Sequence, residues 1–290
     1  MKGEDQRILS NKAREALETL DADARAKYVL QSQWIAYPAG SEILDELAFM
    51  LNRPPSIRSQ GMAIIGSPNN GKTALLHEFV SRHQTERFVD RVNVRILDVQ
   101  CPAGGAITDL YINILRRIGF ITPAAGNTSA KKDRVFNFLS SLQVECLVVD
   151  EIHFLLNKGP RHQMDVLNLL KEISNEICIP IVIAGTTKLQ NVIETNFEVA
   201  SRYPIYQLPD WELSKTFAEF LVRLEATLPL KKVSGFWHFS DLIYTSSNRN
   251  FGNVIEIVRR AAHEAIISGK ESISEEEIIK ASSKITKLNE

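Results

Sequence analysis

Short apolar runs alternate with amphipathic stretches through the middle of the chain. The runs of strand length are residues 61–66, 92–100, 144–150, 179–186 and 203–209. The third and fourth runs are continuously apolar, which is typical of strands buried on both faces. The stretches between the runs, such as 72–83 and 160–177, repeat apolar residues at helical spacing. Strands that alternate with helices predict an α/β fold with a parallel five-stranded sheet covered on both faces.

The pattern changes at both ends of this region. Residues 1–34 are charged and helical with no strong apolar face, and Ser41 is a candidate N-cap for a helix over 42–51. After Pro209 the alternation stops, and helical patterns follow at about 211–226, 235–246, 251–268 and 274–286. We therefore expect an N-terminal helical extension (1–40), an α/β core (41–208) and a small all-helical lid domain (209–290).

Composition and charge exclude some classes of protein. The chain has 290 residues, is 44% hydrophobic and carries a formal net charge of −1. It lacks the run of about 18 apolar residues that a membrane span needs, and its charged N-terminus lacks the apolar centre of a secretory signal. We expect a cytoplasmic protein. Residues 72–134 hold ten Lys and Arg against six Asp and Glu, a local basic surplus in a nearly neutral chain.

A glycine-rich loop follows the first apolar run. It matches the pattern G-x-x-x-x-G-K-[ST] between a predicted strand and a predicted helix, the context that this motif requires. Small residues let backbone N–H groups surround phosphate oxygens, a lysine reaches the β and γ phosphates, and a hydroxyl ligates Mg²⁺. The predicted ligands of ATP and Mg²⁺ are Gly66, Ser67, Pro68, Asn69, Asn70, Gly71, Lys72 and Thr73.

Two further apolar runs end in polar residues suited to hydrolysis. Asp150 ends the run 144–150, and Glu151 follows it directly. Two carboxylates at the end of a buried strand are costly unless they hold a cation or a proton. We expect Asp150 to join Thr73 at the Mg²⁺ and Glu151 to orient or deprotonate the attacking water. The alternative is that the pair caps a turn. Thr186 ends the next run and is the candidate for sensing Mg²⁺ and water, with Thr187 as the alternative residue, unless Thr186 caps the following helix.

Two arginines are candidates for contacts to the phosphates. Arg202 lies between a predicted helix and the last strand, where it could neutralise charge on the γ-phosphate of a neighbouring copy, so activity would require an oligomer. A surface or ion-paired arginine is the alternative. Arg249 precedes a predicted lid helix and is a candidate nucleotide contact, although Asn248 or Asn250 could simply cap that helix.

The order of these motifs resembles that of AAA+ ATPases. The segments "GSPNNGKT", "LVVDE", "AGTT" and "SRYP" occur in sequence before the helical lid. "WIAYPAG", "DEIHFLL", "IPIVIAGT" and "SRYPIYQLPDW" closely resemble the TniB family of transposition proteins, relatives of TnsC and MuB. The resemblance covers roughly residues 25–270. The lid lacks a clear Gly-x-x-Arg motif, so the resemblance gives no further support to a nucleotide contact by Arg249.

The resemblance implies an ATPase that assembles as a homo-oligomeric ring or filament on double-stranded DNA. Such a protein recruits a DDE transposase and disassembles on ATP hydrolysis. The resemblance does not decide whether a separate target-selection protein is also a partner. In this clade a helical insertion after the second strand lines the DNA channel. Its candidate phosphate contacts here are Thr108, Arg116, Arg117, Lys131 and Lys132. Two alternatives remain. A helicase-loader or initiator ATPase would bind a helicase in place of a transposase. A DNA-independent regulatory ATPase would keep the same ATPase rate and oligomer size when duplex DNA is added.

Overall fold

The computed structural model describes residues 9–56, 58–83, 86–87, 92–120 and 127–286. The chain divides into two compact units. The core unit comprises residues 39–68 and 72–209. The helical unit comprises residues 1–38, 69–71 and 210–290. Each unit is described separately below.

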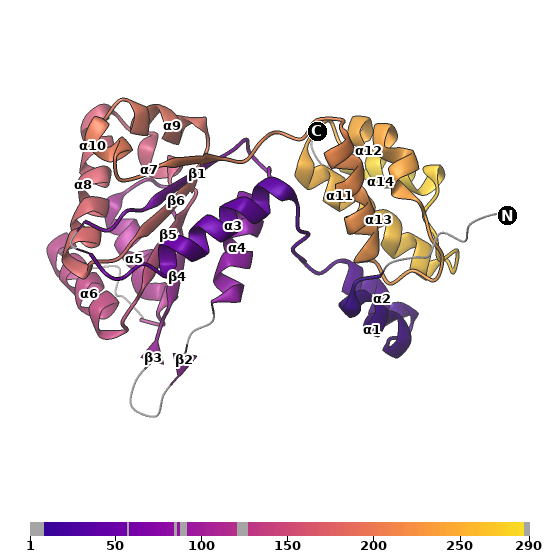
Figure 1. Cartoon of the computed structure of the whole chain (residues 1–290), viewed down its shortest axis with the longest axis horizontal. Helices are drawn as coiled ribbons and strands as arrows, with labels where there is room; N and C mark the ends of the chain where they lie inside the picture. Colours follow the sequence, from indigo (N-terminus) through magenta and orange to yellow (C-terminus); the bar gives the residue numbers. More distant parts are fainter. Residues whose placement is uncertain (1–8, 57, 84–85, 88–91, 121–126, 287–290) are drawn as a thin grey trace. The chain divides into compact units, whose positions relative to one another are not determined.

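Within the described residues, a five-stranded parallel sheet forms the centre of the core unit (Figure 1). Its order is β4-β5-β6-β1-β7. The strands are β1 (Met62–Ile65), β4 (Ile96–Gln100), β5 (Cys146–Asp150), β6 (Ile181–Gly185) and β7 (Ile205–Gln207). Every residue of β1, β5 and β6 is buried, as expected for apolar strands in the middle of a parallel sheet, and the buried set includes Asp150 at the end of β5. The predicted α/β class and the five-stranded parallel sheet are confirmed.

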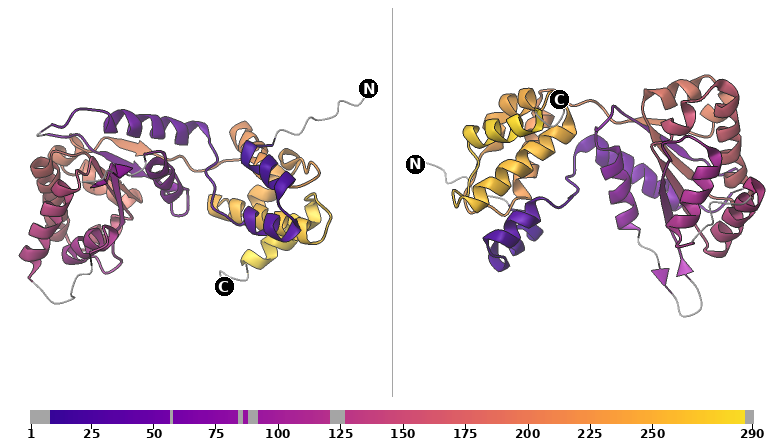
Figure 2. Two further views of the ribbon diagram at one scale, coloured as in Figure 1. Left: turned by 90° about the horizontal axis from the view of Figure 1, so that it is seen from below. Right: turned by 180° about the vertical axis from the view of Figure 1, so that it is seen from behind.

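Helices lie on both faces of this sheet (Figures 1 and 2). They are α3 (Pro38–Leu51), α4 (Lys72–Arg82), α5 (Ile107–Arg117), α6 (Thr128–Ser141), α7 (His153–Leu156), α8 (Pro160–Ile177), α9 (Thr187–Glu194) and α10 (Phe197–Ala200). Leu110 and Ile114 of α5, Leu139 of α6 and Leu170 of α8 pack with the strands in one apolar core. The packed sheet and helices hold the loops at the strand ends in fixed positions.

Some elements begin or divide at places that the apolar pattern does not mark. The run 92–100 contributes two strands, because β3 (Val92–Asn93) pairs antiparallel with β2 (Glu86–Arg87) and only β4 joins the sheet. The helical stretch 189–202 divides into α9 and α10, since the Asn196 side chain accepts a hydrogen bond from Val199 N and starts a second helix. Strand pairing therefore sets the first of these boundaries, and a local cap sets the second.

The helical unit brings the two ends of the sequence together. Its elements are α1 (Asn11–Thr19), α2 (Ala22–Val29), α11 (Lys215–Ala226), the 3₁₀ helix η1 (Phe236–Phe239), α12 (Ser240–Ser246), α13 (Phe251–Ile267) and α14 (Glu275–Thr286). The long helix α13 packs against α2 and α14. The N-terminal helices, which the sequence presents as a separate extension, thus share one compact unit with the C-terminal helices. None of the helices in the described residues is both long enough and apolar enough to cross a bilayer.

Candidate functional site

The ends of three neighbouring strands converge at the carboxyl edge of the sheet. The strand ladder continues past β1, because Gly66 N donates to Gly185 O at 3.2 Å. It also continues past β5, where Ile152 N donates to Ala184 O at 2.9 Å. The glycine loop after β1, the carboxylates after β5 and Thr186 after β6 therefore lie side by side. The carboxyl edge of a parallel sheet is the usual place for a ligand site in such folds.

Lys72 is buried where the glycine loop enters α4. Its side chain is 4% exposed, and its Nζ donates to Gly66 O at 2.9 Å and to Ser67 O at 2.8 Å. A buried ammonium is costly without such acceptors. The first turn of α4 contains no acidic residue, so the positive end of its helix dipole is available to an external anion. The lysine and the helix end together fit a phosphate group.

Thr73 and Asp150 lie close enough to ligate the same cation. The Thr73 hydroxyl donates to Asp150 Oδ2 at 2.6 Å, and Asp150 is 8% exposed. A hydroxyl and a carboxylate are ligands that Mg²⁺ prefers, with water and phosphate oxygens completing its shell. This donor set fits a Mg²⁺ held by Thr73 and Asp150, as the sequence predicts.

Glu151 adopts a backbone conformation that is unusual for its residue type. Its φ of 57° lies in the left-handed region, which non-glycine residues rarely adopt and which costs about 1–3 kcal/mol. Its backbone N–H donates to Asp150 Oδ1 at 2.8 Å. The side-chain Oε2 lies 2.9 Å from His153 Nδ1, although this nitrogen makes no hydrogen bond within the described residues. A strained residue at this edge of the sheet supports a functional role for Glu151.

Thr186 stands at the N-cap position of α9. Its φ and ψ are −89° and −178°, and its side chain makes no capping hydrogen bond within the described part of the chain. Thr186 therefore occupies the N-cap position, as the capping alternative predicts, but its side chain does not form the capping hydrogen bond. The hydroxyl stays available at the carboxyl edge of the sheet, and its sensing role remains a prediction.

Arg202 lies at the opposite, amino edge of the sheet. Its carbonyl accepts a hydrogen bond from Gly61 N at 2.9 Å, just before β1, whereas the glycine loop follows β1. The five residue steps from Gly61 to Gly66 span about 16 Å at the rise of a strand, farther than one arginine side chain extends. Arg202 therefore lies too far from its own glycine loop to contact a phosphate there. Its Nη1 donates to Asn175 Oδ1 at 2.8 Å.

The five candidate DNA contacts do not form one free basic surface in the described residues. Lys131 is 6% exposed, and Lys132 forms an ion pair with Glu172. Arg117 is ion-paired with Asp98, donating to it through Nε at 3.1 Å. The Thr108 and Thr128 hydroxyls lie 3.2 Å apart. Arg116 is exposed. The loop residues 121–126, which the sequence includes in this segment, lie outside the described residues.

Arg249 belongs to the helical unit and is exposed just before α13. Its φ is 58°, and the next residue, Asn250, caps α13 by accepting from Asn253 N at 3.2 Å. Capping by Asn250, one of the alternatives from the sequence, is therefore observed. Loop residues 69–71 belong to the same unit, where Asn69 Nδ2 donates to Asn250 Oδ1 at 2.8 Å. The predicted contact between Arg249 and a nucleotide remains a prediction.

Comparison with known proteins gives the family. The family profile described as "Bacterial TniB protein" matches residues 25–213, more than half of the sequence. The chain belongs to the TniB family. The TniB resemblance seen in the sequence is thus confirmed. No curated protein sequence matches this chain.

Solved structures similar to this TniB protein share the AAA+ fold. Cdc6p from Pyrobaculum aerophilum has 20% identity and a TM-score of 0.65, covering 88% of this chain and 70% of that one. The Aeropyrum pernix ORC1 protein, solved in complex with DNA, has 17% identity and a TM-score of 0.68, covering 90% and 69%. A RuvB variant from Thermotoga maritima has 17% identity and a TM-score of 0.52, covering 92% and 72%. At these identities the similarity shows the fold alone.

Two side chains of the TniB protein have contacts at these sites that the sequence reasoning did not use. His153 lies beside Glu151, and Asn175 accepts the hydrogen bond from Arg202. The spacing of two residues between Glu151 and His153 was visible in the sequence, although it carried no specific chemical signal. Asn175 lies on α8, 27 residues before Arg202 in the α10–β7 turn, and no sequence pattern connects them.

Proposed function

We propose that this TniB-family protein is an ATP-driven switch that assembles on double-stranded DNA. In its ATP-bound form it recruits and activates a DDE transposase, and hydrolysis of ATP to ADP and phosphate releases the assembly. The observation that carries the proposal is the group formed by buried Lys72, the Thr73–Asp150 hydrogen bond and strained Glu151 at one edge of the sheet. The TniB family supports the link to transposition.

The residues at the carboxyl edge have distinct parts in the proposed reaction. Lys72 exchanges its loop carbonyls for the β and γ phosphates. Thr73 and Asp150 would hold Mg²⁺, which would supply positive charge against the charge that develops on the phosphates. Glu151 accepts a proton from the attacking water as the water oxygen bonds to the γ-phosphorus and the bond to the β–γ bridging oxygen breaks. His153 Nδ1, 2.9 Å from the Glu151 carboxylate, is close enough to orient it once the two groups align for a hydrogen bond.

Arg202 gives a physical reason for assembly. Since it lies at the amino edge of its own sheet, it can reach a triphosphate only in a neighbouring copy. ATP then contacts Lys72 of one copy and Arg202 of the next, and loss of the γ-phosphate weakens the contact between copies. A ligand held between two copies stabilises the assembled state by mass action.

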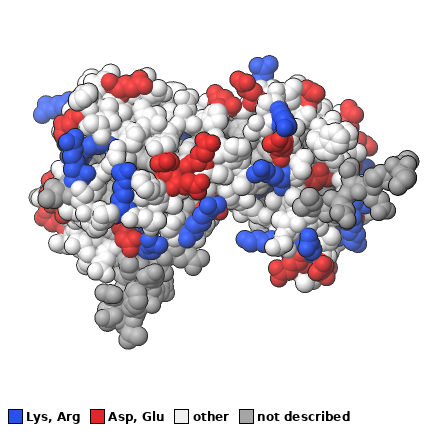
Figure 3. Space-filling model, viewed as in Figure 1, with Lys and Arg blue, Asp and Glu red and all other residues white. Residues whose placement is uncertain are grey.

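Contact with DNA in the proposed assembly would be made to phosphates without reading bases. Arg116 and Arg117 are the exposed candidates among the five, and Arg117 needs to leave Asp98 to bind a phosphate. The exposed face of α3 is unsuited to phosphates, because acidic side chains gather over this helix (Figure 3), where Glu42, Asp45 and Glu46 are exposed. Because the proposed contacts are made to phosphates and release counterions, the affinity for DNA should fall steeply as the salt concentration rises.

The experiment measures assembly on a long duplex by light scattering, with ATP, ADP or no nucleotide. Glu151→Gln should bind ATP, assemble on DNA and lose at least about 100-fold in turnover, because the acid-base group is absent. Lys72→Ala should fail to assemble. A Glu151→Gln protein that hydrolyses ATP at the parental rate contradicts the assignment of Glu151. A parental protein that stays a single copy with ATP, Mg²⁺ and DNA contradicts the proposed function.

A further inference from the structure

A basic surface lies at the amino edge of the core unit, around the short helix α10. Here it is called the α10 surface and is formed by Arg58, Lys171, Phe197, Glu198 and Arg202. Lys171 Nζ lies 2.6 Å from Glu198 Oε1, and Arg58 Nη2 donates to Ser201 Oγ at 3.1 Å. Ser201 immediately precedes Arg202. Loop 58–61, the C-terminal half of α8 and the α10–β7 turn therefore meet at one place.

The α10 surface carries a net positive charge. Hydrogen bonding and attraction to Lys171, with further attraction from Arg202 and Arg58, lower the pKa of Glu198. The carboxylate therefore stays ionised at neutral pH and offsets only one of the three cations. Two positive charges remain on an accessible surface, where Arg58 is exposed and the Glu198 side chain is 58% exposed. Such a surface favours an anion with more than one charge.

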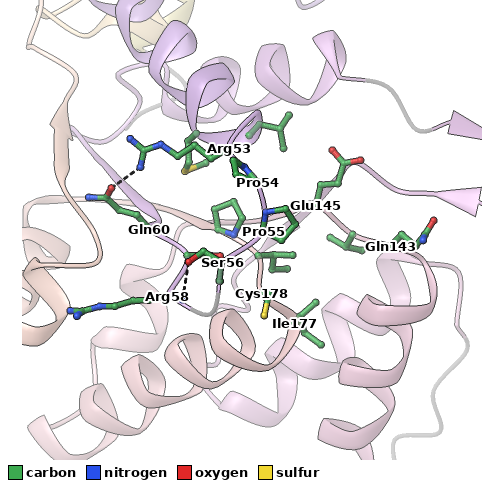
Figure 4. A pocket seen from close by; sticks show the side chains of 16 residues that line it. Arg53, Pro54, Pro55, Ser56, Arg58, Gln60, Gln143, Glu145, Ile177 and Cys178 are labelled. Atoms are coloured by element: carbon green, nitrogen blue, oxygen red, sulfur yellow. Dashed lines mark hydrogen bonds between the residues drawn. The ribbon is translucent and has the colours of Figure 1, made fainter.

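The two arginines of loop 53–60 differ in their surroundings. Arg53 donates to Gln60 Oε1 at 2.9 Å, and its guanidinium lies 4.8 Å from the centre of the Phe49 ring. Both arginines border a cavity of about 590 Å³ at the amino ends of the strands. Figure 4 shows the Arg58 side chain extending away from Arg53 and from Cys178. Arg58 thus belongs with Arg202, and Arg53 serves as its matched control.

The α10 surface also offers an apolar contact. Phe197, the first residue of α10, is 89% exposed, and Glu198 follows it directly. Aromatic rings are among the side chains that contribute most when they are buried in an interface, and this exposed ring is available for such a contact. The nucleotide edge of a second copy complements this surface in charge, because bound triphosphate and the carboxylates Asp150 and Glu151 are negative.

We propose that the α10 surface docks on the nucleotide edge of a second copy, and that Arg58 joins Arg202 as a second cation for that copy's triphosphate. The inference rests on the proposed function and names a residue outside the recognised motifs. Arg58 donates to phosphate oxygens of the neighbour's ATP, while Phe197 provides the apolar contact that holds the two copies together. Arg202 Nε has no hydrogen-bond partner among the described residues, so binding of the neighbour can reorient this guanidinium.

The experiment compares Arg58→Ala with Arg53→Ala in DNA-stimulated ATP hydrolysis. Arg58→Ala should lower turnover about 10- to 100-fold, the effect of losing a hydrogen bond to a charged group, while Arg53→Ala keeps the parental rate. Arg58→Lys should recover part of the loss. Neither alanine variant should change binding of a fluorescent ATP analogue by the unassembled protein, because the α10 surface is remote from the copy's own glycine loop.

Mixing tests whether Arg58 acts across the contact. Copies with Glu151→Gln bind ATP and assemble without hydrolysing it, and they still present Arg58 and Arg202, so an excess of them should restore turnover by Arg58→Ala copies. Absence of rescue at every ratio overturns the inference, as does equal turnover by Arg58→Ala and Arg53→Ala. A loss of DNA affinity by Arg58→Ala with unchanged turnover per assembled copy assigns Arg58 to DNA and also overturns it. If parental copies do not assemble, the proposed function fails and the inference fails with it.

Discussion

A buried ion pair connects the two ends of the sequence within the helical unit, and Arg25→Met tests its contribution. Arg25 is 3% exposed and donates to Glu271 at 2.8 and 2.6 Å and to Pro229 O at 2.8 Å. Methionine keeps much of the apolar stem and removes the guanidinium. Glu271 is then left as a buried carboxylate without its main partner. We expect the helical unit to lose stability.

The structure sets the size of this loss. Removing one partner of a buried pair costs about 3–5 kcal/mol. The lower end applies here, because Lys231 N still donates to Glu271 at 3.2 Å, and a cavity of about 490 Å³ beside the pair can admit water. A loss of about 3 kcal/mol corresponds to a fall in melting temperature of about 12 °C for a unit of this size. The double variant Arg25→Met/Glu271→Gln should regain about 2 kcal/mol, because no unpaired charge remains.

Tryptophan fluorescence during urea unfolding measures this loss selectively. The chain has three tryptophans, and Trp34, Trp211 and Trp237 all belong to the helical unit. Arg14→Met is the matched control, because Arg14 is exposed on α1 and its loss should cost less than about 0.5 kcal/mol. If Arg25→Met unfolds at the same urea concentration as Arg14→Met, the pair does not stabilise the helical unit and the reasoning is wrong.

Three further predictions concern the metal site, the contact between copies and acid stability. Asp150→Asn should lower Mg²⁺-dependent ATP turnover at least about 100-fold, because a charged metal ligand is lost; a turnover unchanged with Mg²⁺ contradicts the site. Phe197→Ser should raise the protein concentration needed for assembly about tenfold without changing the melting temperature of the single copy, as light scattering and calorimetry can check. Glu271 has a folded-state pKa lowered by its hydrogen bond from Arg25. Its stabilising contribution is therefore complete above the unfolded pKa of about 4.3 and is lost as the pH falls through the folded value. Urea titrations between pH 6 and pH 3 should show a loss that Arg25→Met/Glu271→Gln lacks.

The sequence predicted the sheet and the nucleotide edge because their signals are local. Each strand of the sheet is an apolar run, and the ligands that follow β1, β5 and β6 are adjacent to these runs in sequence. The carboxyl ends of parallel strands meet at one edge, so the motifs predict their own proximity. The contact between Thr73 and Asp150 at 2.6 Å follows from this geometry, although 77 residues separate them.

The remaining features depend on contacts that have no sequence pattern. The α1 and α2 helices bury small residues such as Ala13, Ala16 and Ala26, which give too weak a pattern to assign a packing partner. The burial of Lys131 likewise could not be inferred, because a basic residue on a predicted helix is normally solvated. Arg58 lies 143 residues from its partner Ser201, and only the fold brings the two together.

The opposite positions of the two functional edges limit how copies can assemble. The nucleotide residues lie at the carboxyl edge and the α10 surface at the amino edge, separated by the length of a strand. A contact that joins the carboxyl edge of one copy to the amino edge of the next can repeat from copy to copy as a heterologous contact, because each added copy leaves one edge open. Heterologous contacts produce rings when the rotation closes and helical filaments when it does not. In either arrangement each added copy completes one nucleotide site and presents another, so ATP hydrolysis in the proposed assembly should rise with the number of contacts between copies.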